Sequence, residues 1–191
     1  MVNVVGLNLS HDLSCALMVD GRVVVAIEEE RLVRVKHCDG KTHLGRMIPF
    51  HALKYCLRAA DMRVDDIDLF VGSCTQVTAL PDLERCLVGV DPTRISEPAF
   101  PGHHLTHAWS TFGPCPFESA AVLVLDVNGS SDGTTKENYS VFHGSGNDLR
   151  PMRREQVHLG EAGAGDVYSI YAAILRLSPM PLTYEGEGDF G

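Results

Sequence analysis

Two histidines one helical turn apart could hold a metal ion. His103 and His107 are four positions apart, and residues at that spacing lie on the same face of an α-helix. Their imidazoles could therefore reach one cation, and imidazole is a ligand for zinc, iron, copper and nickel. Two imidazoles do not complete a site, so a further ligand is required. The alternative interpretation is a pair of surface or capping histidines near the start of a helix.

Asp126 is the natural candidate for that further ligand. It ends the most apolar run of the chain, residues 119–126, so its carboxylate would emerge at the carboxyl end of a strand. Ligands bind at that edge in open α/β sheets. Asn128 and Gly129 follow closely, and a glycine-containing turn can present backbone N–H groups to a phosphate. The alternative is an ordinary turn, in which Asp, Asn and Gly are all common.

A second polar cluster, residues 8–14, contains Ser10, His11 and Asp12. Its residues are mostly small or polar, and such a turn can wrap a phosphate. His11 could act as a general acid or base because the ordinary pKa of imidazole lies near neutrality. The alternative is a hairpin loop with an incidental histidine.

Residues 28–37 are strongly charged. A run of this kind is usually a solvated face. Arg34 and Lys36 could instead clamp an anionic substrate, since arginine makes bidentate contacts with phosphate and lysine supplies a point charge. Residues 184–188 place two glycines among carboxylates, which fits either a ligand loop or a fraying end.

The elements that must position these residues begin with a meander. Apolar runs at 2–9, 16–19 and 23–27 predict three antiparallel strands, with Asp20-Gly21 as the turn between the second and third. Apolar residues at helical spacing predict a helix over 49–60. Further along, the pattern predicts a strand at 69–73, a short helix at 81–87, a helix at 103–112, a central strand at 119–126, a returning strand at 139–143 and a helix at 166–177.

This order predicts an α/β chain, with a mixed sheet flanked by helices behind an antiparallel meander, as in a ribonuclease-H-like lobe. The 191 residues suffice for one domain or one large lobe, and the net charge of −9 argues against a nucleic-acid partner. No apolar run reaches the length of a membrane span, and the N-terminus lacks the pattern of a signal peptide. We therefore expect a cytoplasmic protein without a membrane partner.

Several motifs in a fixed order carry a family resemblance. They are G-L-N-L-S-H-D-L-S-C-A at 6–16, the D-G turn at 20–21, the charged block at 28–37, the helix start at 48–57, H-H-L-T-H-A-W-S at 103–110, the strand at 116–126, Y-S at 168–169 and E-G-E-G at 185–188. Together they cover nearly the whole chain. The sequence resembles the O-carbamoyltransferases of the nodulation and cephamycin type.

The resemblance implies a fold, a set of cofactors and a site. The N-terminal domain of that family looks like the universal tRNA threonylcarbamoyl-transfer protein, with an actin-like ATPase fold. It implies a divalent metal, Fe²⁺ first and Zn²⁺ or Mn²⁺ as alternatives, on His103, His107 and Asp126. His11 with Asp12 would be catalytic. Phosphate contacts would come from Ser10, Asn128, Gly129, Arg34 and Lys36.

The implied reaction has two stages. A separate C-terminal domain makes carbamoyl-adenylate from carbamoyl phosphate and ATP, and the N-terminal domain transfers the carbamoyl group to a hydroxyl of a small acceptor such as a natural product or sugar. Residues 1–191 would then be the first lobe of the N-terminal domain. We expect the remaining lobe and the carbamoyl-adenylate-forming domain to be partners of this segment.

One departure from the family pattern concerns the turn after Asp126. The family commonly has D-G-x-G there, whereas this chain continues with Val127, Asn128 and Gly129. Two other interpretations stay open: a catalytically incomplete lobe that acts as a binding or scaffold subunit, and the tRNA-modifying relative. The charged block at 28–37 and the acidic net charge argue against the latter.

Overall fold

The computed structural model describes residues 1–10, 12–38, 48–127 and 129–164. Within it the chain forms two compact units, Met1–Thr106 and His107–Gly191. Four features expected from the sequence lie outside the described residues: His11, Asn128, the helix at 166–177 and the glycine-rich stretch at 184–188. Among the described helices, none is both long and apolar enough to cross a membrane.

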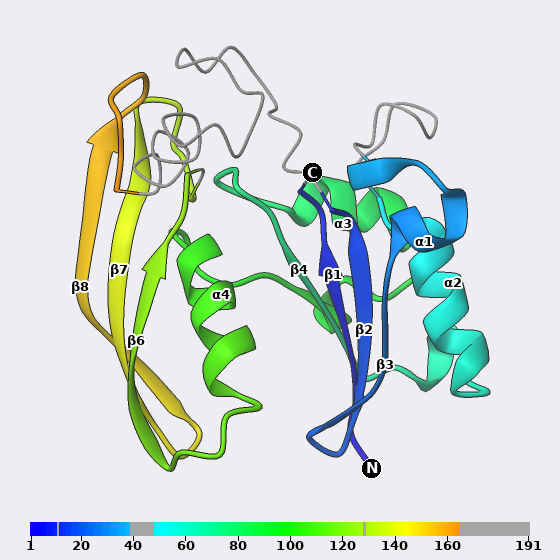
Figure 1. Cartoon of the computed structure of the whole chain (residues 1–191). Coiled ribbons are helices and arrows are strands. Elements are labelled where there is room, and N and C mark those ends of the chain that lie inside the picture. The colour runs from blue at the N-terminus through cyan, green and yellow to red at the C-terminus, as the bar shows by residue number, and fades with distance from the viewer. Residues whose placement is uncertain (11, 39–47, 128, 165–191) are drawn as a thin grey trace. The chain divides into compact units, whose positions relative to one another are not determined.

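The first unit is built on a five-stranded mixed sheet with the order β3-β2-β1-β4-β5 (Figure 1). The expected antiparallel meander is present as β1 (Asn3–Asn8), β2 (Ser14–Val19) and β3 (Arg22–Glu28). Asp20 and Gly21 both have positive φ, as a two-residue hairpin turn requires. β4 (Leu69–Ser73) pairs in parallel with β1, and β5 (Ile95–Ser96) pairs in parallel with β4.

Helix α2 (Phe50–Ala59) closes the core of the first unit. It buries one face, Ala52, Leu53, Cys56 and Leu57, against inward-facing residues of the sheet. Burying a leucine side chain contributes roughly 1.5–3 kcal/mol to stability, so the packing of this face stabilises the helix. Around it lie α1 (Glu29–Val33), α3 (Leu80–Cys86) and the 3₁₀ turns η1 (Lys36–Cys38), η2 (Val64–Asp66) and η3 (Pro92–Arg94).

The second unit contains an antiparallel sheet with the order β6-β7-β8. Its strands are β6 (Ser119–Leu125), β7 (Thr135–Ser145) and β8 (Asp148–His158). Helix α4 (His103–Phe112) packs on this sheet through Phe112, whose ring lies so close to Gly144 that a Cβ there would be 2.6 Å from it. The division between the two units falls within the residue range of α4, after Thr106.

Most of the predicted elements are confirmed, one expectation is wrong and one strand was missed. Most charged residues of the block 28–37 are exposed, as in a solvated run, but Glu29 at the start of α1 is fully buried. β6 is at an edge of its sheet among the described residues, not in the centre. β8 was not predicted at all, since its charged sequence, with Arg150, Arg153 and Arg154, lacks the apolar alternation that signals a strand.

Candidate functional site

Helix α4 presents two adjacent rows of side chains. His104, Ala108 and Phe112 form the inner row at a spacing of four residues, and all three are buried. His103 and His107 form the next row, one turn apart as the sequence predicted. His103 is 7% exposed, whereas the side chain of His107 is 51% exposed. The helix therefore holds one sheltered and one accessible imidazole on the same side.

Asp126 meets these histidines at the end of β6. Its Oδ2 lies 3.5 Å from His107 Nε2, and its side chain is 25% exposed. One ligand atom each from His103, His107 and Asp126 lies within 4.8 Å of the other two. His103 and His107 belong to the same helix, α4, so the helical geometry sets the spacing between the two residues. The three residues proposed from the sequence as ligands thus converge.

The donor set fits a divalent metal ion. Ligand atoms about 2.1 Å from a shared ion lie at most about 4.2 Å apart, so small side-chain rotations would close the set around a cation. Two imidazoles and a carboxylate suit iron, zinc or manganese. Metal binding itself stays a prediction that this geometry supports.

The electrostatic field at His107 favours positive charge. The hydrogen bond to Asp126 raises the pKa of His107, and the charges of Asp126 and Glu137 act in the same direction, while burial of the ring opposes them. A site that stabilises a proton on this imidazole also attracts a cation that replaces the proton.

The turn after Asp126 is held by the strand that follows it. Lys136 Nζ donates to the carbonyl oxygen of Val127 at 2.8 Å, and the Ser130 N–H donates to Glu137 Oε2 at 2.9 Å. Further along the turn, the side chain of Asp132 accepts from the N–H groups of Thr134 and Thr135. The N–H groups of Ser130, Thr134 and Thr135 are therefore engaged within the protein.

The predicted phosphate contacts in this turn consequently rest on Asn128 and Gly129. Asn128 lies outside the described residues, and Gly129 is buried. The contacts remain a prediction.

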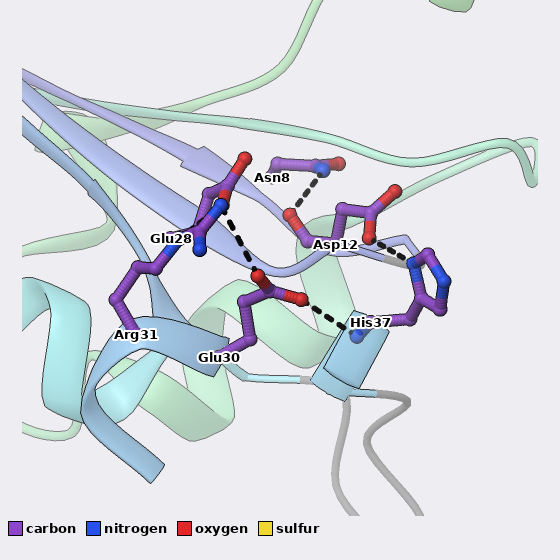
Figure 2. A network of polar contacts seen from close by, with 6 residues as sticks. All are labelled: Asn8, Asp12, Glu28, Glu30, Arg31 and His37. Carbon is purple, nitrogen blue, oxygen red and sulfur yellow. Dashed lines mark hydrogen bonds and ion pairs between the residues drawn. The ribbon is translucent and has the colours of Figure 1, made fainter. Parts of the chain in front are cut away.

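A second cluster gathers around His37 (Figure 2). His37 Nδ1 lies 2.8 Å from Asp12 Oδ1, and the backbone N–H of His37 donates to Glu30 Oε2 at 2.8 Å. The Asp12 N–H donates to the His37 carbonyl oxygen at 2.9 Å, and Asn8 Nδ2 donates to the Asp12 carbonyl oxygen at 3.1 Å. Asp12, one of the two expected catalytic residues, is thus tied to a histidine that the site predictions did not include.

Both Asp12 and His37 have positive φ, at 59° and 58°. Non-glycine residues adopt this conformation seldom, and it is concentrated at functional sites. One ligand atom each of Asp12, Glu30 and His37 also lies within 4.8 Å of the others. The hydrogen bonds of His37 with Asp12 and Glu30 explain why these three residues lie so close together. The sequence signal for His37 was its place at the end of the charged block 28–37.

The remaining predicted residues are placed as follows. Ser10 is 6% exposed, and its hydroxyl donates to Asn8 Oδ1 at 2.8 Å. Arg34 caps α1 in the left-handed conformation and is exposed, as is Lys36 in η1. An anion clamp formed by Arg34 and Lys36 therefore stays a prediction.

Comparison with known sequences supports the family resemblance. No protein-family model matches the chain. The nodulation protein NolNO of Sinorhizobium fredii is 32% identical over an alignment that covers 74% of this chain and 22% of that protein. An uncharacterized protein of Synechocystis, sll1178, is 28% identical over 79% of this chain and 29% of its own length. The chain thus spans less than a third of either relative.

Comparison with solved structures confirms the expected actin-like ATPase fold. Component A of the (R)-2-hydroxyglutaryl-CoA dehydratase of Acidaminococcus fermentans superposes with a TM-score of 0.52 at 15% identity, covering 92% of this chain and 55% of that one. The activator of the 2-hydroxyisocaproyl-CoA dehydratase of Clostridium difficile, solved with bound ADPNP, gives 0.50 at 14% identity, covering 92% and 53%. At these identities the likeness concerns the fold alone.

Proposed function

The chain is a relative of the nodulation protein NolNO, and from this premise we propose that it is part of a carbamoyltransferase with a metal centre on His103, His107 and Asp126. The observation that carries the proposal is the convergence of these three ligand atoms within 4.8 Å. A helix and the end of a strand supply them, so the arrangement is pre-organised before any ligand binds.

The proposed reaction transfers a carbamoyl group from carbamoyl-adenylate to a hydroxyl of a small acceptor, such as a natural product or sugar. The carbamoyl-adenylate would form from carbamoyl phosphate and ATP in another part of the enzyme. The acceptor oxygen then attacks the carbamoyl carbon and forms a C–O bond. The bond from that carbon to the phosphate oxygen breaks, and AMP leaves with the electron pair.

The chain's own residues would hold the reactants and move one proton. His103, His107 and Asp126 would bind the cation, with Fe²⁺ as the first expectation and Zn²⁺ or Mn²⁺ as alternatives. When bound, the cation would supply a Lewis-acidic centre for the adenylate phosphate and the acceptor oxygen. His11 would accept the proton of the acceptor hydroxyl, because the ordinary pKa of imidazole lies near neutrality. Its sequence neighbour Asp12 is held by Asn8 and His37.

The experiment that tests the function uses the full-length enzyme with carbamoyl phosphate, ATP and a panel of sugars and hydroxylated natural products. Mass spectrometry should show carbamoylated acceptor together with AMP. In His107→Ala, we expect transfer to fall by at least about a hundredfold, the scale of removing one electrostatic stabiliser, while carbamoyl-adenylate still forms.

The matched control is His158→Ala, which removes an exposed histidine at the end of β8. Its transfer rate should equal that of the unmodified enzyme. The proposal fails if no acceptor is carbamoylated, or if His107→Ala transfers the group at the unmodified rate.

A further inference from the structure

Glu137 is a buried acid that the proposed reaction does not use. It belongs to β7 and is 1% exposed. Transferring a carboxylate from water into a protein interior is unfavourable unless hydrogen bonds and positive charge compensate for it. A buried acid beside a candidate cation site therefore calls for a chemical explanation.

The burial of Glu137 results from a β-bulge. Along β7, Gly144, Phe142 and Ser140 are buried, so the even-numbered positions face the interior. The pairing with β8 shifts by one residue between Glu137 and Tyr139, which leaves Asn138 as the extra residue. Because one inserted residue reverses the alternation, Glu137 joins the buried face despite its odd number.

That face is the one on which α4 packs. Phe112 of α4 lies against Gly144, on the same face of β7 as Glu137. Glu137 also lies at the end of the sheet where Asp126 emerges, because the β6–β7 pairing ends at Leu125 and Tyr139. Because of the bulge, the Glu137 side chain lies on the face of the sheet that α4 covers, at the end where Asp126 follows β6.

Glu137 is also bound to the turn that follows Asp126. Its Oε2 accepts the Ser130 N–H at 2.9 Å, and its own N–H donates to the Ser130 carbonyl oxygen at 3.0 Å. Ser130 is itself buried, so this carboxylate has a fixed position relative to the turn. The charge of Glu137 contributes to raising the pKa of His107, which agrees with the geometry.

We propose that Glu137 is a positioning residue of the candidate metal centre, whose buried negative charge strengthens the binding of a divalent cation by His103, His107 and Asp126. Glu137 is not one of these ligands, because the ligand atoms that lie within 4.8 Å of one another come from His103, His107 and Asp126. Outer carboxylates of this kind typically change metal affinity by about ten- to a hundredfold. The inference rests on the metal centre of the proposed function.

The test measures the affinity of this chain for Mn²⁺ by isothermal titration calorimetry. Glu137→Gln keeps the size of the side chain and an oxygen that can accept from Ser130, but it removes the charge. We expect its dissociation constant to rise by about ten- to a hundredfold over the unmodified chain. Glu118→Gln is the matched control: it removes the same charge from an exposed residue just before β6, at the opposite end of that strand from Asp126.

A dissociation constant of Glu137→Gln within twofold of the unmodified value would overturn the inference, as would an equal weakening in Glu118→Gln. Circular dichroism checks that Glu137→Gln is folded. If it is not, Glu137→Asp, which retains the charge, should bind within a few-fold of the unmodified chain, and a hundredfold loss there would also overturn the inference.

The outcomes separate this inference from the proposed function. If the unmodified chain binds Mn²⁺ no better than His107→Ala, the metal centre fails and the role of Glu137 fails with it. If His107→Ala loses binding while Glu137→Gln retains it, only the role of Glu137 is wrong.

Discussion

His104 and His107 show how little the residue type alone reveals about a role. The two lie three positions apart on α4, yet His104 is fully buried in the packing row while half of the His107 side chain reaches solvent near Asp126. Helical spacing predicted that His103 and His107 lie on one side of the helix, as they do in the structure, because residues four apart share a face.

Other parts of the site could not be predicted from the sequence. The partnership of Asp12 with His37 joins positions separated by 25 residues, and no local pattern specifies such a contact. Glu137 was missed for a related reason, since its burial depends on an unpaired residue in the middle of a strand. The spacing of residues predicts which side chains share a face within one helix or strand. It does not predict contacts between different elements or the side to which a residue turns at a bulge.

Asp132 provides a pH-dependent prediction at the residue scale. Hydrogen bonds from the backbone N–H groups of Thr135 and Thr134 stabilise its charged form and lower its pKa. Because the pKa is lower in the folded chain than in the unfolded one, the stabilisation is present above the unfolded value and is lost as pH falls through the folded value.

NMR titration of the Asp132 carboxyl should therefore give a pKa below the ordinary aspartate value of 3.8. Asp132→Asn should make the stability of the turn less dependent on pH in the acidic range. A pKa at or above the ordinary value would contradict the prediction.

At the scale of elements, Glu29 joins α1 to α2. Its Oε1 accepts the backbone N–H of His51 at 3.0 Å and lies 2.7 Å from His51 Nδ1, and its Oε2 accepts the Ala52 N–H at 2.6 Å. A residue of α1 thus satisfies two of the N–H groups that every helix leaves without partners in its first turn. The charged block at 28–37 consequently has a structural function that its composition conceals.

We expect Glu29→Ala to reduce the free energy of unfolding by about 2–4 kcal/mol, because it leaves two N–H groups at a buried helix start without their acceptor. Urea denaturation measures the change. Glu28→Ala, in the exposed neighbour, should stay within about 0.5 kcal/mol of the unmodified chain. Equal effects of the two substitutions would show that Glu29 does not hold α2.

The contact between α4 and its sheet depends on Gly144. A Cβ at this position would lie 2.6–2.7 Å from three ring carbons of Phe112, which is too close for a real contact. Gly144→Ala should therefore destabilise the chain by about 1–3 kcal/mol through overpacking. It should also weaken Mn²⁺ binding, since α4 carries His107 and the sheet carries Asp126.

Thermal denaturation and calorimetry measure the two effects of Gly144→Ala. Ser145→Ala, at the exposed neighbouring position, is the control. Adding Phe112→Leu to Gly144→Ala should recover part of the lost affinity, because the smaller side chain gives the new methyl group room. Unchanged stability in Gly144→Ala would contradict the prediction, because it would show that α4 can move away from the new methyl group without destabilising the chain.

The sequence predicted those elements whose apolar residues follow one period. Residues 103–112 and 69–73 were predicted with the bounds that α4 and β4 have, because their patterns are helical and strand-like throughout. β8 escaped prediction, since it forms one edge of the described sheet and carries charged side chains on its exposed positions. β5 has only two residues, too few for any periodicity.

At the scale of the whole molecule, the chain matches only part of the length of the proteins it resembles. It spans 53% of the activator that was solved with ADPNP and 22% of NolNO. We predict that, in the proposed enzyme, the contacts to adenine and ribose come from regions that correspond to the part of these proteins that the chain does not match.

We therefore expect isothermal titration calorimetry to show weak or no binding of ATP to this chain, with a dissociation constant of about 1 mM or higher, equivalent to roughly 4 kcal/mol or less of binding free energy. The full-length enzyme, measured under the same conditions, is the comparison. Micromolar binding by the chain alone would show that it holds a complete nucleotide site.

Because of the bulge at Asn138, the direction of the Glu137 side chain depends on the number of residues in β7 as well as on their identity. Deleting Asn138 would leave Glu137 in the protein but turn its carboxylate out to solvent. Homologues aligned column by column could thus share the same glutamate while differing in whether it faces the interior. For this segment, the loss or gain of one residue beside Glu137 would therefore change the environment of this acid without changing the acid itself.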